Sequence, residues 1–67
     1  DTERAVELSA RAMERAPENP SILDTHGWIL HLAGQHQKAE PIIERALALS
    51  PENEEIKQHL EAIKRSL

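Results

Sequence analysis

Cysteine, tyrosine and phenylalanine are absent from this chain of 67 residues, and its only aromatic residue besides the histidines is Trp28. Without cysteine, neither a disulfide framework nor a thiolate zinc site can stabilise the fold, and the redox compartment stays undetermined. A chain this short buries only about 60% of the surface that its unfolded form exposes. We therefore expect one small domain of marginal stability, held together by helix packing.

Positive charge is also scarce, because 8 Lys and Arg residues stand against 12 Asp and Glu residues, for a net charge of -4. The charges are scattered, so no basic stripe could follow a phosphate backbone, and nucleic acid is not an expected partner. No apolar run approaches the roughly 18 residues of a membrane span, and no signal-peptide core is present. We expect no membrane insertion, and the localisation stays open.

Motifs for catalysis and metal binding are lacking as well. No nucleophile elbow and no Gly-rich phosphate loop occurs. The four histidines include no pair spaced three or four residues apart on one helix, and no His-Glu-x-x-His motif is present. These histidines are His26, His31, His36 and His59. We expect no enzyme activity, no metal site and no cofactor.

What the chain does contain is an internal repeat. When each residue is compared with the residue 34 positions later, identical and conservative pairs share one register, and such a period indicates stacked supersecondary units. The identical pairs are Ala5/Ala39, Arg11/Arg45, Ala12/Ala46, Pro17/Pro51, Glu18/Glu52, Asn19/Asn53, Ile22/Ile56 and Ile29/Ile63.

The repeat resembles the tetratricopeptide repeat, a helix-turn-helix unit whose pattern combines large apolar, small and proline residues at fixed spacing. The matching residues are Leu23, His26, Gly27, Leu30, Ala39, Ile43 and Pro51. Aliphatic side chains replace the large residues of the family, and His26 stands where the family prefers an apolar side chain. Trp28 is not the signature tryptophan, because it follows the glycine instead of preceding it by four residues. The resemblance implies an all-α, right-handed α-solenoid fragment of four antiparallel helices.

Apolar periodicity and helix-end signals predict where these helices lie. The expected ranges are Thr2 to Ala16, Pro20 to Ala33, Gln37 or Lys38 to Leu49, and Glu54 to Ser66. Asn19 and Asn53 are expected to cap the second and fourth helices, with Ser21 as an alternative cap for the second. Gly34 is expected to close the second helix in the left-handed conformation. Pro41 should make the start of the third helix irregular without breaking it.

Residues 1–67 are thus expected to form one domain of three parts. Residues 1–17 form the second helix of a preceding repeat, residues 20–53 a full repeat, and residues 54–67 a capping helix. Glu61 takes the place of the glycine of the repeat, and Lys64 and Arg65 lie in the last turn, as expected of a cap that ends a solenoid. A weaker repeat copy whose continuation was cut off is the alternative. The chain starts at Asp1 without methionine, so a fragment of a longer protein is a further open alternative.

Small residues mark the expected close helix contacts. The resemblance places Gly27, Ala39 and Ala46 at the closest contacts within and between repeats. A glycine inside a helix lowers helix stability by about 1 kcal/mol relative to alanine. This cost independently indicates that Gly27 is needed for close packing. Ala39 and Ala46 are also explained by helix propensity alone.

The resemblance further implies a concave binding face lined by the first helix of each repeat. On the second helix it places six residues there: Ser21, Asp24, Thr25, Trp28, His31 and Leu32. On the fourth helix it adds Glu55 and His59. Helical spacing independently puts Asp24, Trp28, His31 and Leu32 on one side. Trp28 is then either a binding anchor or a core residue that closes the small domain.

We expect a non-catalytic module that binds a protein or peptide through this face, with a structural spacer of a longer solenoid as the alternative. An acidic groove with one aromatic favours a neutral or basic segment with an apolar anchor. The helix that the first one would pack against in a full repeat array is missing from the chain. We therefore also expect self-association as a homodimer through the N-terminal end.

Overall fold

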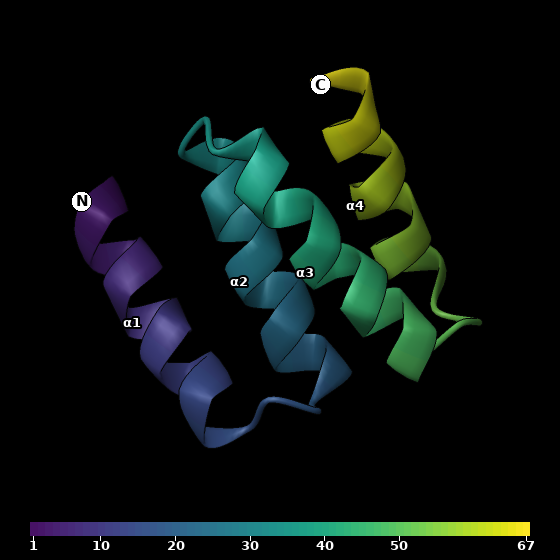
Figure 1. The fold of residues 1–67 in the computed structure, drawn as a ribbon, viewed down its shortest axis with the longest axis horizontal. Helices are drawn as coiled ribbons and strands as arrows, with labels where there is room; N and C mark the ends of the chain where they lie inside the picture. Colours follow the sequence, from purple (N-terminus) through teal and green to yellow (C-terminus); the bar gives the residue numbers. More distant parts are fainter.

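Four helices and no strands make up the protein, which we describe from a computed structural model of residues 1–67 (Figure 1). The helices are α1 (Thr2–Arg15), α2 (Pro20–Leu32), α3 (His36–Leu49) and α4 (Glu54–Arg65). The predicted all-α class is confirmed. Three of the four predicted ranges agree with the observed ones to within one residue at each end.

The start of each of the first, second and fourth helices is fixed by an acidic or amide side chain. The Asn19 Oδ1 atom accepts a hydrogen bond from the backbone N–H of Ile22 at 3.2 Å, and Pro20 follows as the first helical residue. Asn53 does the same for the N–H of Ile56 at 3.1 Å. Asp1 caps α1 by accepting from two backbone N–H groups. These side chains satisfy donors that lack intrahelical partners, so Asn19 and not Ser21 is the cap of α2.

Gly34 ends α2 as predicted, with a φ of 84°. The N–H of Gly34 donates to the carbonyl of His31, and the N–H of Gln35 donates to the carbonyl of Leu30, a Schellman arrangement. The next helix, α3, already begins at His36, one or two residues earlier than predicted, and no side chain caps it. Pro41 therefore lies beyond the first turn, and α3 continues through it unbroken.

The central helix is α2, which lies between α1 and α3 (Figure 1) and also contacts α4. In contrast, α1 contacts α2 only, and α4 contacts α3 and α2. The molecule is thin, with principal extents of 30 × 27 × 15 Å. None of the four helices is long and apolar enough to cross a bilayer. The thin shape leaves both flanks of α2 close to the surface.

The core consists of eight buried apolar side chains supplied by α2, α3 and α4: Leu23, Leu30, Ala39, Ile43, Ala46, Ile56, Leu60 and Ile63. Ala39, Ala46 and Ile43 have no exposed surface. Gly27 lies directly against Ile43, because a Cβ atom added at Gly27 would come within 2.6 Å of the Ile43 side chain. Residue 27 therefore has to be small for α2 and α3 to approach as closely as they do.

The two ends of the helical row differ in polarity. On α4, Glu61 and Lys64 are exposed and face no further helix. On α1, the Leu8 side chain keeps 50% of its surface exposed, although its counterpart one repeat later, Ile42, packs against the core. The outer face of α4 thus carries charged side chains, followed by the exposed Leu67, whereas α1 exposes Leu8.

Candidate functional site

Trp28 lies outside the hydrophobic core. It is half-buried, and it belongs neither to the eight core residues nor to the partly buried apolar residues that pack against them. The nearest rings are histidines: the indole stacks on His59 of α4, with a centroid distance of 4.1 Å and an interplanar angle of 20°. On its own helix, the indole meets His31 at 4.8 Å. The largest side chain of the chain is therefore placed among polar rings at the surface.

His36, the first residue of α3, extends this arrangement. Its ring lies 4.7 Å from that of His31, and the two Nδ1 atoms are 2.7 Å apart. One Nδ1 carries a hydrogen and donates it to the other, because two bare nitrogens would repel each other at this distance. We call His59, Trp28, His31 and His36 the ring row. It joins α4, α2 and the start of α3.

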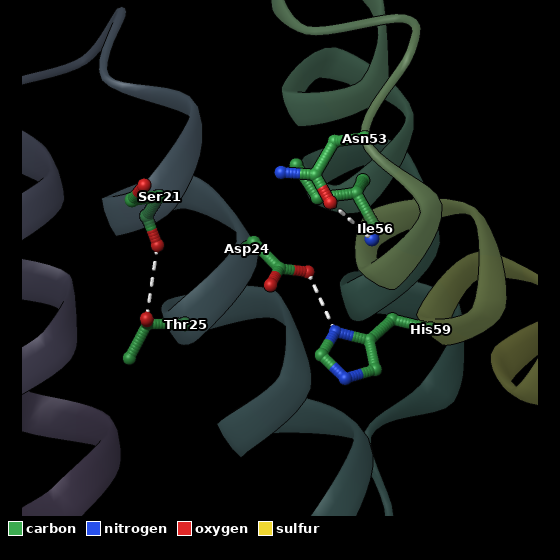
Figure 2. A network of polar contacts seen from close by, with 6 residues as sticks. All are labelled: Ser21, Asp24, Thr25, Asn53, Ile56 and His59. Carbon is green, nitrogen blue, oxygen red and sulfur yellow. Dashed lines mark hydrogen bonds and ion pairs between the residues drawn. The ribbon is translucent and has the colours of Figure 1, made fainter.

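The fourth helix is held to α2 by a polar contact beside the ring row (Figure 2). His59 donates from Nδ1 to Oδ1 of Asp24, at 2.8 Å. Asp24 is buried, so this hydrogen bond satisfies a carboxylate that would otherwise be costly to bury. The contact fixes the orientation of the His59 ring, which then presents its face to Trp28. Asp24 acts here by positioning a neighbouring ring.

The remaining residues expected at the binding face do not belong to the ring row. Ser21 and Thr25 are exposed on the first half of α2, where the Thr25 hydroxyl donates to the Ser21 carbonyl at 2.9 Å (Figure 2). Leu32 is 68% exposed, but it borders a surface depression together with Thr2 and Val6 of α1. It thus lies on the flank of α2 that faces α1.

Burial and the neighbouring histidines favour the neutral form of His31. Burial lowers the pKa of His31 from its ordinary value of 6.5, and the nearby His36 and His59 lower it further by charge repulsion. The ring row contains no Lys or Arg side chain, so it presents a largely aromatic surface.

A second histidine contact is buried between α1 and α2, away from the ring row. The Ser9 Oγ atom lies 2.6 Å from His26 Nδ1 and 3.1 Å from the carbonyl oxygen of Val6, to which the hydroxyl donates. His26 therefore carries its hydrogen on Nδ1 and donates to Ser9. Burial lowers the pKa of His26, and this chain of hydrogen bonds holds the neutral ring. The pair explains how a histidine fits where the repeat pattern prefers an apolar residue.

A serine beside a histidine is a familiar pair in nucleophilic catalysis, but the geometry of this pair indicates a structural role. The Ser9 hydroxyl hydrogen points to a backbone carbonyl, and both side chains are buried, so no substrate carbonyl can reach Oγ. No group of three or more His, Cys, Asp or Glu side chains is placed to hold a metal ion.

We compared the chain with known proteins in three ways, and no protein-family model, curated protein or solved structure matches it. The resemblance to tetratricopeptide repeats therefore rests on the internal register and the residues that match the repeat pattern.

Sequence reasoning found part of this site and missed part. It placed Asp24, Trp28 and His31 on one side of α2 and His59 opposite them on α4. It missed His36, because the histidine search considered spacings of three and four within a helix. The pair at a spacing of five forms only because the Gly34 turn folds α3 back beside α2.

Proposed function

We propose that the protein is a non-catalytic module of tetratricopeptide type that binds a protein or peptide segment, with Trp28 as its anchor. The single observation that supports this proposal is the position of Trp28, which lies among the histidines and outside the core. A domain this small would be expected to bury its largest apolar side chain in the core. Tryptophan is enriched among the residues that contribute most to binding. If Trp28 were a core residue, burial of its large apolar surface would stabilise the fold.

The chemistry of the surroundings indicates the kind of partner. The lowered pKa of His31 favours its neutral form, Glu55 at the start of α4 is exposed, and no Lys or Arg belongs to the ring row. An apolar side chain of the partner could rest on the half-buried indole, and a neutral or basic segment around it would meet no repulsion. Ser21 and Thr25 would offer polar contacts along the first half of α2.

The test is selection from a random peptide library, with the Trp28→Ala variant as the counter-selection. Peptides that bind the wild type and not the variant should share an apolar residue and lack acidic residues beside it. Their binding should produce a saturable shift of the Trp28 fluorescence. If wild type and Trp28→Ala enrich the same peptides, Trp28 is not the anchor.

The alternative is a structural spacer within a longer solenoid, for which the exposed Leu8 face of α1 is the favouring observation. A spacer would yield no peptide with a saturable effect on Trp28 fluorescence. The same selection therefore separates the two functions.

A further inference from the structure

The spacing of the two Nδ1 atoms in the His31 and His36 pair is close to the spacing of two nitrogen ligands on one metal ion. Its two Nδ1 atoms approach to 2.7 Å, and the two residues are tied by the short Gly34 turn. Two nitrogens bound side by side to a tetragonal metal ion lie about 2.8 Å apart, since each bond is about 2.0 Å long and the angle between them is near 90°. A tetrahedral ion requires about 3.3 Å. The observed spacing fits the tetragonal ion better.

We propose that His31 and His36 form a two-nitrogen chelate for copper(II), in which the ion binds both Nδ1 atoms from one side of the line that joins them, after the shared hydrogen has left. Tetragonal coordination by nitrogen and oxygen ligands is typical of copper(II), which also binds such ligands most tightly among the divalent first-row metals. The protein supplies two adjacent positions, and water fills the others. The proposal does not depend on the peptide-binding function.

Binding in this way needs no change in the net charge of the pair. A ring that carries its hydrogen on Nδ1 moves it to Nε2 through solvent, and both Nδ1 lone pairs then face the ion. Histidine binds metals as the neutral imidazole.

The other histidines are committed elsewhere, which makes the pair specific. His59 uses its Nδ1 for Asp24, and His26 uses its Nδ1 for Ser9 in the buried contact. The Trp28 ring lies 4.8 Å from the His31 ring, so it can report on an ion bound at the pair. A paramagnetic ion at the pair should quench the Trp28 fluorescence strongly.

The test is a titration of the N-terminally acetylated chain with copper(II) at pH 7.4, followed by Trp28 fluorescence. Acetylation removes the terminal amine, a competing copper ligand. We expect quenching that saturates at one equivalent of copper. His36→Gln should weaken the apparent affinity by about tenfold or more, because the second imidazole of a chelate binds as an intramolecular ligand. Gln37→Ala, an exposed substitution next to His36 and outside the ring row, should leave the copper affinity nearly unchanged.

A second readout keeps the result independent of the variants. In NMR spectra of the wild type, substoichiometric copper(II) should first broaden the resonances of residues 31 to 36. Equal copper affinity of the wild type and His36→Gln, or broadening that begins elsewhere in the chain, would overturn the assignment. The far-ultraviolet circular dichroism of each variant verifies that the helices are intact.

Discussion

At the residue scale, Gly27 is the position where a single methyl group matters most. A Cβ atom there would come within 2.6 Å of the fully buried Ile43 side chain, whereas nothing lies within 4 Å of a Cβ at Gly34. Gly34 instead requires a left-handed backbone, which costs other residues about 1–2 kcal/mol. The two glycines therefore serve different physical purposes.

Gly27→Leu should accordingly destabilise the protein more than Gly34→Ala. Overpacking a close contact typically costs about 1–3 kcal/mol, and leucine at position 27 would have to displace α3 as a whole. Urea unfolding followed by circular dichroism measures both variants. Equal losses, or a larger loss for Gly34→Ala, would show that α2 and α3 tolerate a wider separation.

The coupling between Ser9 and His26 can be tested by replacing both residues with their counterparts from the next repeat. One repeat later, the same two positions hold Ile43 and Leu60, which are both core residues. Ser9→Ile alone should cost about 1–3 kcal/mol, because it leaves the buried Nδ1–H of His26 without an acceptor. His26→Leu alone should cost less, because the Ser9 hydroxyl still donates to the Val6 carbonyl. The double variant should approach or exceed wild-type stability, because both partners become apolar. Additive losses in a urea double-mutant cycle would contradict this coupling.

Acid should destabilise the protein through the same histidine. The pKa of His26 is lower in the folded state than its ordinary value of 6.5, so below that pH the unfolded chain binds more protons. The stabilisation is therefore complete above the unfolded-state pKa and is lost as the pH falls towards the folded-state pKa. His31 contributes with the same sign. The Ser9→Ile/His26→Leu variant should lose less stability than wild type between pH 7.5 and 5.5 in urea unfolding.

At the element scale, the helices could be predicted well because their ends are decided locally. Asn19, Asn53 and Gly34 each act within a few residues of their own position, through a side-chain oxygen or a positive φ. The start of α3 was predicted one or two residues too late, since Gln35 makes no side-chain cap and offers no sequence signal. Local chemistry therefore accounts both for the agreement and for the difference.

The helix α1 packs against α2 only, so we expect any self-association to take place through its exposed face. Leu8 is exposed, and the flanking Ala5 and Ala12 are only partly buried, whereas their repeat counterparts Ala39 and Ala46 are fully buried. A second copy that docks on this face would cover it symmetrically. One short helix offers much less than the roughly 1,200–2,000 Å² of a stable interface, so the dimer should be weak.

Analytical ultracentrifugation should accordingly show reversible dimers only at high protein concentration. Leu8→Glu should abolish them, and Leu49→Glu, which changes an exposed leucine on α3, should not. A strict monomer at all concentrations, with identical behaviour of both variants, would rule out the N-terminal interface.

At the scale of the whole molecule, the ring row depends on how α2, α3 and α4 pack, and no local pattern encodes that. Helical periodicity placed Asp24, Trp28 and Leu32 on one side, yet in the structure only Asp24 and Trp28 meet His59, whereas Leu32 lies beside α1. The stacking of Trp28 on His59 requires two helices that are far apart in sequence. Such contacts become visible only once the helices are assembled.

The central claim is that Trp28 is available for a partner and is not required by the core, and the free energy of unfolding of Trp28→Ala tests it most directly. Leu30→Ala, in the core on the same helix, is the matched control and should cost about 2–5 kcal/mol. The account predicts a loss below about 2 kcal/mol for Trp28→Ala, since mainly its aromatic contacts with the histidines disappear. A loss of about 3–5 kcal/mol, the cost of removing a tryptophan from a core, would contradict it.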